Sequence, residues 1–420
     1  MDADIVCISH LWWDWVWQRP QQLISRLARD HRVFWAEEPH IEIGPALEGF
    51  EVRRESTGVD VGRLVYRSDA ETFWRRLNES RRDGGQPFAI SDRITEASLL
   101  FDSFAQPRLE REVVEHVARW RKGPLVLWLY TPAVVRFIDS LEPDLVVYDV
   151  MDELAAFRYA PPLLQEQERE LLQRADLVFC GGPSLYEARR SRNPAVHLFP
   201  SGVDEAHFAT ALDERLEMPE AVRDLPKPRI GFFGVIDERM DLELLTAIAG
   251  ARPDWSWLMV GPVLKIPEAA LPRGPNIHYL GKQPYEALPA YLKSFDVAMM
   301  PFAINEATRF ISPTKTLEYM AAGRQVVSTP IPDVVSMYGS VVRIAATADQ
   351  FVAQVASALA ETHSDRAERA GRQAQLLTRY SWDGIVDEMH ALITDRLERC
   401  TSRGMPNESR LPTDVSGGGS

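Results

Sequence analysis

The sequence predicts an α/β protein with two doubly wound domains, and two observations carry this prediction. Short apolar runs alternate with longer amphipathic segments along the chain, which is typical of βαβ units and parallel sheets. The chain has 420 residues, of which 45% are hydrophobic, so it is long enough for two domains that each bury a core. We therefore expect two parallel sheets, one after the other along the chain.

The expected strands form two sets in chain order. The first set spans Ile5–Ser9, Arg32–Glu38, Leu125–Tyr130, Leu145–Val150 and Asp176–Gly182. The second set consists of the runs RIGFFGV, SWLMVGP, IHYLG, DVAMMPF and QVVSTP, between Arg229 and Pro330. Residues 204–228, rich in proline and charge, are expected to connect the domains. Residues 400–420 have too few apolar side chains for a core and are expected to be disordered.

The segment from Ser312 to Pro330 has the pattern of an anion-binding site. Pro313 suits the first turn of a short helix, Gly323 can end that helix with a positive φ, and a buried parallel strand follows. Lys315 and the free N–H groups of the helix start would then face an anion. Glu318, on nearly the same side, could accept hydrogen bonds from two sugar hydroxyls. Taken alone, the segment would by default be explained as a surface helix with one exposed lysine and one exposed glutamate.

Four further stretches agree with this segment in order and spacing. They are FPSGVDEAHF at 199–208, GFFGVIDERMDLELL at 231–245, the strands and loops at 257–302, and RYSWDGIVDEMHALI at 379–393. Together the five stretches resemble glycosyltransferases of the GT-B fold, especially the family 4 group, in which two Rossmann-like domains face a cleft. The resemblance implies an acceptor-binding domain over 1–203, a nucleotide-sugar-binding domain over 229–378, and a helix over 379–399 that crosses back to the first domain.

The resemblance also implies which residues of the second domain bind the donor. They follow the carboxyl ends of strands and are Arg239, Lys282, Ser312, Thr314, Lys315 and Glu318. Arg239 and Lys315 would hold a diphosphate, whose negative charge grows as it leaves. Glu318 would hold the ribose, and Lys282 lies where the backbone contacts the base. On spacing alone, Arg239 is explained equally well as a surface residue.

Phe310 departs from the pattern of the family. It stands eight residues before Glu318, where retaining family 4 enzymes have the first glutamate of a pair. The loss of that carboxylate leaves open whether the reaction retains the anomeric configuration. It also makes the chain more similar to divergent members with an SPxK loop, from envelope and exopolysaccharide pathways.

The first domain opens with HLWWDWVWQRPQQL, from His10 to Leu23. Tryptophan faces pack well against sugar rings, so the four tryptophans predict an acceptor platform, although we expect at least two of them to be simply buried. An inverting transfer needs a base for the acceptor hydroxyl. In order of preference the candidates are Asp152, Asp14, Glu153 and His10. Helix capping explains one acid of the group Asp149, Asp152 and Glu153, and mutual repulsion among the three can raise a pKa.

Composition limits the partners and cofactors. The net charge of −14 argues against nucleic acid, which needs a concentrated basic surface. Asp2 and Asp4 have the spacing of a metal-binding DxD pair but precede the first strand, and the resemblance implies helix dipoles and cations in place of a metal. No metal or cofactor is therefore expected. Cys7, Cys180 and Cys400 lie far apart and are expected to be buried or free thiols in a reducing compartment.

The chain shows no targeting or membrane signal. A first strand at Ile5 leaves no room for a signal peptide, and no apolar stretch approaches about 18 residues, so we expect a cytoplasmic protein. Two arginine groups could contact anionic lipid head groups at the inner face of the membrane, or could simply be solvated helix faces. They are Arg75, Arg76, Arg81 and Arg82, and Arg189, Arg190 and Arg192.

These observations predict a glycosyltransferase. It would move a hexose or related sugar from a nucleoside-diphosphate sugar to a hydroxyl acceptor, which could be a glycan, a lipid-linked sugar or a small molecule, in surface polysaccharide or glycolipid synthesis. A sugar-nucleotide 2-epimerase of the same fold is one alternative. A nonenzymatic sensor of sugar nucleotides is the other, favoured if the acids are only helix caps. The donor base, the sugar and the acceptor stay open.

Overall fold

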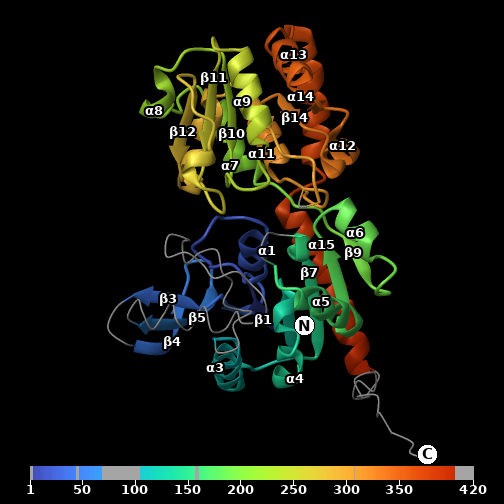
Figure 1. The fold of residues 1–420 in the computed structure, drawn as a ribbon. Helices are drawn as coiled ribbons and strands as arrows, with labels where there is room; N and C mark the ends of the chain where they lie inside the picture. The colour runs from blue at the N-terminus through green and yellow to red at the C-terminus, as the bar shows by residue number, and fades with distance from the viewer. Residues whose placement is uncertain (1–2, 44–46, 69–104, 157–159, 307, 403–420) are drawn as a thin grey trace, which may run out of the picture.

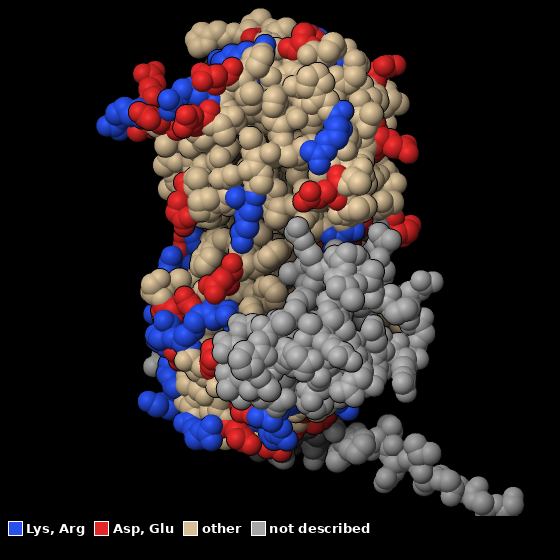
Figure 2. All heavy atoms as spheres, turned by 60° about the vertical axis from the view of Figure 1, so that its left-hand side comes forward, with Lys and Arg blue, Asp and Glu red and all other residues tan. Residues whose placement is uncertain are grey.

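The computed structural model describes residues 3–43, 47–68, 105–156, 160–306 and 308–402. They form two α/β domains, and a long carboxyl-terminal helix runs from the second domain along the first (Figure 1). Acidic and basic side chains are interspersed on the face seen in Figure 2, without a continuous basic surface.

The first domain is built on a sheet of order β3-β5-β2-β1-β6-β7-β8-β9, in which only the added β4 is antiparallel. Five of its strands confirm the sequence prediction, namely β1 Asp4–Ile8, β2 Arg32–Ala36, β6 Leu125–Leu129, β7 Leu145–Val150 and β8 Leu177–Cys180. The others were not predicted, and they are β3 His40–Ile43, β4 Leu47–Arg54, β5 Val59–Ser68 and β9 Val196–Leu198.

Helices cover both faces of this sheet, as the alternation along β1 shows. Val6 and Ile8 pack into the core cluster that contains α3 and α4, whereas Ile5 and Cys7 pack into the cluster that contains α1 and the carboxyl-terminal helix. The helices are α1 Arg19–Leu27, α3 Ala105–Trp120, α4 Phe137–Leu141, α5 Leu163–Arg174 and α6 Pro183–Arg189. Short 3-10 helices lie at Pro132–Val134 and Leu154–Ala156.

The second domain has a fully parallel sheet of order β12-β11-β10-β13-β14-β15. Its strands are β10 Arg229–Phe233, β11 Ser256–Val260, β12 Ile277–Gly281, β13 Val297–Met300, β14 Val326–Ser328 and β15 Arg343–Ile344. The strand order reverses between β10 and β13. In doubly wound sheets, ligands bind beyond the carboxyl ends of strands at this reversal.

Eight helices of the described chain surround this sheet. They are α7 Glu205–Ala209, α8 Glu220–Arg223, α9 Leu242–Ala251, α10 Leu288–Ser294, α11 Lys315–Ala321, α12 Pro332–Tyr338, α13 Ala348–Leu359 and α14 His363–Leu377. The segment 204–228 is therefore more than a connection. It contains α7 and α8, and Phe208 and Val222 are fully buried in the core of the second domain. Its prolines and charges conceal these few apolar anchors.

The helix expected over 379–399 is α15, Trp382–Ser402. Trp382, Met389 and Ile393 recur at helical spacing and are buried in the core of the first domain. Figure 1 shows α15 lying along that domain, so the last described helix fastens the second domain to the first. Residues 403–420, most of the tail expected to be disordered, lie outside the described residues.

A buried ion pair fixes the start of α1. The Arg19 guanidinium donates to both oxygens of Asp149 at the end of β7, with Nη2 2.8 Å from Oδ1. Its Nη1 also donates to the carbonyl oxygen of Phe199 at 2.7 Å. Burial raises the pKa of Asp149, and the charge of Arg19 opposes that rise. Asp149 is thus a structural residue that joins α1, β7 and the chain leaving the first domain.

We expect Asp149→Asn to destabilise the protein by about 3–5 kcal/mol, because it leaves a buried guanidinium without its carboxylate. The free energy of unfolding from chemical denaturation measures this loss. Asp14→Asn is a matched control, since Asp14 is exposed and its ion pairs should contribute less than about 1 kcal/mol. Equal losses in the two variants would contradict a special role for the buried pair.

Candidate functional site

Lys315 begins α11, and its side chain crosses the end of β10. Gly234 makes room for it: with φ at 145°, this glycine lies so close that an added Cβ would stand 2.6 Å from Lys315 Cε. The Lys315 Nζ lies 6.0 Å from the centre of the Phe233 ring. Among the described residues, no carboxylate lies within ion-pair distance of this ammonium group. Lys315 is therefore positioned to bind an anion at the end of the central strand.

The pattern predicted around Lys315 is largely confirmed. α11 runs from Lys315 to Ala321, Gly323 has a φ of 69°, and β14 is a buried parallel strand. Pro313 lies before the helix and accepts a hydrogen bond from the Thr316 N–H at 3.2 Å, so it does not occupy the first helical turn. Thr314 occupies the cap position, and no side chain caps this helix start.

Glu318 follows on the same helix with an unsatisfied carboxylate. Its Oε2 is buried and receives no hydrogen bond from the described residues. Burial raises the pKa of Glu318, and the charge of Lys315 opposes that rise. The charge of Glu318 also acts on Tyr285, because burial and then this charge raise the pKa of the Tyr285 hydroxyl. A buried carboxylate without a donor is a place where a ligand hydroxyl fits.

Tyr285 also contacts the first domain. The Gln22 Nε2 of α1 donates to the Tyr285 hydroxyl at 3.3 Å. The Tyr285 ring stacks on His207, with centroids 4.3 Å apart and planes 10° apart. Neither Gln22 nor Tyr285 was predicted as a site residue, because neither carries a charge that sequence alone singles out.

Arg239 is half-buried and paired. Its guanidinium lies 2.7 Å from Asp237 Oδ2 and donates to both carboxylate oxygens. Burial lowers the pKa of Arg239, but the charge and hydrogen bonds of Asp237 outweigh burial and raise it. Arg239 is thus held at the end of β10 and is not a loose surface residue.

Asp152 and His10 of the first domain lie in the field of these cations. Burial raises the pKa of Asp152, while the charges of Arg239, Lys265 and Lys315 lower it. Burial and the charge of Lys265 lower the pKa of His10 to about 4. We call His10, Asp152, Arg239, Lys265 and Lys315 the interdomain cluster. It joins two of the four predicted bases to two of the predicted donor-binding cations.

Lys265 is the member of this cluster that sequence reasoning missed. It follows β11 in a loop, and its backbone has a φ of 59°, a conformation that residues other than glycine rarely adopt. Its Nζ lies 3.6 Å from Glu238 Oε1. Its place beyond the carboxyl end of a parallel strand was the signal that could have found it.

The other two predicted bases lie in ion pairs on the first domain. Asp14 is exposed and pairs with Arg53 at 2.8 Å and Arg63 at 3.4 Å. Glu153 pairs with Arg189 at 2.8 Å. The structure therefore gives Asp14 and Glu153 partners outside the interdomain cluster, and Asp152 is the acid that faces the cations.

The tryptophans are less buried than expected. Of the four, Trp13 alone is buried, against Trp35 and Trp17, whereas Trp12, Trp15 and Trp17 are half-buried. Trp15 lies across the domain interface from Lys282, whose Nζ is 5.1 Å from the ring centre. Lys282 thus contacts the first domain.

The loop before α11 also contacts the first domain. Phe310 packs against the hydrophobic core of the first domain. An added Cβ at Gly182 would stand 2.7 Å from Ser312 Cβ, so Ser312 lies against the start of α6. The Asp333 Oδ1 accepts a hydrogen bond from the Ser184 N–H at 3.0 Å, and its Oδ2 receives none from the described residues. Phe310 thus occupies an apolar contact between the domains.

Other predicted features have structural explanations. Asp4 is buried and accepts hydrogen bonds from the Lys122 and Gly123 N–H groups. No group of three or more His, Cys, Asp or Glu side chains suited to a metal occurs among the described residues. Cys7 and Cys180 are buried free thiols, while the side chain of Cys400 is outside those described.

The arginine groups give no basic surface in the described chain. Arg189 is buried between Glu153 and Glu168 and cannot contact lipid, and Arg190 pairs with Glu187. Arg75, Arg76, Arg81 and Arg82 lie outside the described residues.

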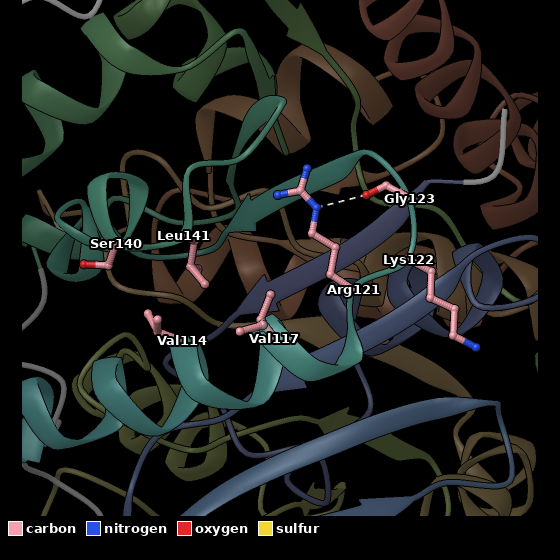
Figure 3. A pocket seen from close by; sticks show the side chains of 8 residues that line it. Val114, Val117, Arg121, Lys122, Gly123, Ser140 and Leu141 are labelled. Carbon is pink, nitrogen blue, oxygen red and sulfur yellow. Dashed lines mark hydrogen bonds between the residues drawn. The ribbon is translucent and has the colours of Figure 1, made fainter.

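A cavity of about 360 Å³ lies elsewhere, between α3 and α4 (Figure 3). Its walls include Val114, Val117 and Leu141, and Arg121 and Lys122 lie at one side. Lys122 precedes β6 and Leu141 precedes β7, so the cavity is at the amino ends of the strands. It is therefore separate from the interdomain cluster, which lies at the carboxyl ends.

Sequence comparison relates the second domain to a known protein family. Residues 227–364 match the family model described as "Glycosyl transferases group 1". The second domain is therefore similar to the group 1 glycosyltransferases. The chain is also similar to the "Putative teichuronic acid biosynthesis glycosyltransferase TuaH" of Bacillus subtilis (strain 168), with 25% identity over 279 aligned residues. The alignment covers 60% of this chain and 69% of that protein.

Solved structures show the fold of the whole chain. Sucrose-phosphate synthase from Thermosynechococcus elongatus superposes with a TM-score of 0.67 at 16% identity, covering 94% of this chain and 100% of that one. A structure described as "Trehalose-6-phosphate from E. coli bound with UDP-2-fluoro glucose" gives 0.64 at 12% identity, covering 94% and 99%. The expected GT-B fold is thus confirmed. Among the described residues, no helix is both long and apolar enough to cross a bilayer.

We expect the His10 imidazole to stay neutral until the pH approaches 4, because its pKa is lowered from 6.5 to about 4. The folded state then binds fewer protons than the unfolded state between these values, so His10 should reduce stability as the pH falls from 6.5 to 4. The difference in unfolding free energy between the wild type and His10→Gln, followed across this range, isolates the effect. Imidazole NMR shifts that titrate near pH 6.5 would contradict it.

Proposed function

We propose that the protein is a glycosyltransferase that moves a hexose or related sugar from a nucleoside-diphosphate sugar to a hydroxyl acceptor in the synthesis of a cell-surface glycan. The observation that carries this proposal is the pair of side chains on α11 that are available to bind a nucleotide. Lys315 has no carboxylate partner among the described residues, and Glu318, three residues later, has a buried oxygen without a hydrogen-bond donor. The printed name of TuaH, a teichuronic acid glycosyltransferase, supports the surface-glycan role.

The donor diphosphate would lie at the end of β10. There Lys315 and Arg239 supply positive charge close to the uncapped start of α11. As the bond between the sugar and the diphosphate breaks, charge accumulates on the diphosphate oxygens, and fixed cations stabilise that charge. Glu318 would accept hydrogen bonds from the ribose. Because side-chain cations perform this role, we propose that the transfer needs no metal ion.

The acceptor would approach from the first domain, where Asp152 is our candidate for the catalytic base. Burial raises the pKa of Asp152, which makes its carboxylate a better proton acceptor than an exposed aspartate. His10, neutral because its pKa is lowered to about 4, is the second candidate. Trp15, half-buried at the interface, offers a ring face to an acceptor that is a glycan, a lipid-linked sugar or a small molecule.

Lys315→Ala and Glu318→Gln should each weaken the binding of a nucleoside diphosphate by about tenfold or more, because each loses a charged hydrogen-bonding partner. Thermal shift with UDP, GDP, ADP and dTDP identifies the nucleotide for the wild type, and calorimetric titration then gives its affinity for each variant. Lys122→Ala, on the opposite edge of the first sheet, is the control. Nucleotide affinity that is unchanged in both site variants would refute the proposed anion-binding site.

Asp152→Asn should lower turnover by about a hundredfold or more with little change in donor affinity, because general-base catalysis contributes about 10²–10⁴-fold. Release of nucleoside diphosphate that depends on an added acceptor measures turnover.

The same assay with EDTA should show unchanged activity. Activity that EDTA abolishes and magnesium restores would contradict metal independence, and donor isomerised without an acceptor would instead indicate an epimerase.

A further inference from the structure

Glu238 has a carboxylate that the fold leaves unsatisfied. Both of its oxygens are buried, and neither receives a hydrogen bond from the described residues. Lys265 lies 3.6 Å from Oε1, near enough for an ion pair but too far for a hydrogen bond. Buried charged oxygens normally have donors, so two such oxygens on one side chain call for an explanation.

Lys265 is held in place at a conformational cost. Its left-handed backbone, with a φ of 59°, is shared among the described residues other than glycine only by Glu142, which ends α4. Strain of this kind persists where the surrounding structure fixes the residue, often at a ligand site. Here the strain keeps the ammonium group beside Glu238 and near the first domain.

The position of the pair relates it to the proposed donor. Glu238 immediately precedes Arg239 in the loop after β10, and Lys265 lies in the loop after the neighbouring strand β11. The charge of Lys265 acts on both His10 and Asp152. The pair therefore lies next to Arg239, which would hold the diphosphate, and within electrostatic range of the first-domain groups that would meet the acceptor. The group between a diphosphate and an acceptor is the sugar that is transferred.

We propose that Glu238 and Lys265 form the subsite that recognises the hydroxyl groups of the transferred sugar. The Glu238 oxygens accept hydrogen bonds from two hydroxyls, and the Lys265 ammonium donates to a hydroxyl oxygen. Hydroxyl groups suit this pair because each is both a donor and an acceptor. Since removing a buried partner costs more than a pair contributes, the subsite discriminates against a sugar that lacks the hydroxyl. This inference rests on the proposed function, whose donor it specifies.

The test compares the affinity of a nucleoside diphosphate with that of its sugar conjugate. The probes are UDP, GDP, ADP and dTDP with UDP-glucose, GDP-mannose, ADP-glucose and dTDP-glucose, titrated by calorimetry into the full chain. In Glu238→Gln and Lys265→Met, we expect the conjugate to bind about tenfold to a hundredfold more weakly, while the diphosphate alone binds as in the wild type. Lys265→Arg, which keeps a donor, should lose less than Lys265→Met.

Two matched controls change the same residue types elsewhere. Glu243→Gln alters an exposed acid on α9, and Lys122→Met alters a lysine at the amino ends of the first sheet. A conjugate-to-diphosphate affinity ratio that stays at the wild-type value in both site variants overturns the subsite. So does a change confined to the KM of the acceptor. If instead no diphosphate raises the melting temperature of the wild type, the proposed function itself fails, so the two failures are distinguishable.

Discussion

The electrostatic contact between the domains is the constraint on which the site depends. Asp152 belongs to the first domain, yet the charges that act on it come from Arg239, Lys265 and Lys315 of the second. This contact exists only because both sheets turn the carboxyl ends of their strands toward the interface. α15 returns to the core of the first domain, and the Ser184–Asp333 hydrogen bond joins α6 to α12. The proposed base and the residues proposed to bind the diphosphate thus come from domains that the fold holds together.

Phe310 places an apolar side chain at the interface between the domains, where retaining family 4 enzymes have a carboxylate. The apolar side chain at that position packs against the hydrophobic core of the first domain, so it contributes to the contact by burial. A carboxylate there would have to be desolvated against the same apolar surface, at a large cost. Where retaining family 4 enzymes have a glutamate, Phe310 therefore gives an apolar contact between the domains in place of a charge. Under the proposed function, Asp152 is then the acid that the second-domain cations act on.

Local patterns predicted the parallel strands and the anion-binding site, because periodicity, Gly323 and the helix start are encoded within a few residues. They did not predict the hairpin of β4 and β5 or the burial of α7 and α8, which depend on tertiary packing. Among the candidate bases, sequence alone could not separate Asp152 from Asp14 and Glu153, since the distinction lies in distant partners such as Arg53 and Arg189. Tyr285 was missed because it carries no charge, and Lys265 was missed although it follows the carboxyl end of a parallel strand.

The charges of the interface also suggest how donor and acceptor chemistry are linked. In the structure, Arg239 is balanced by Asp237 and Lys265 by Glu238, whereas Lys315 has no carboxylate within ion-pair distance in the described chain. A bound diphosphate would add negative charge beside Arg239 and Lys315, two of the cations that lower the pKa of Asp152. Because these cations would then be partly neutralised, the pKa of Asp152 would rise further and its carboxylate would become a stronger base. Under the proposed function, the donor would therefore prepare the base for the acceptor hydroxyl.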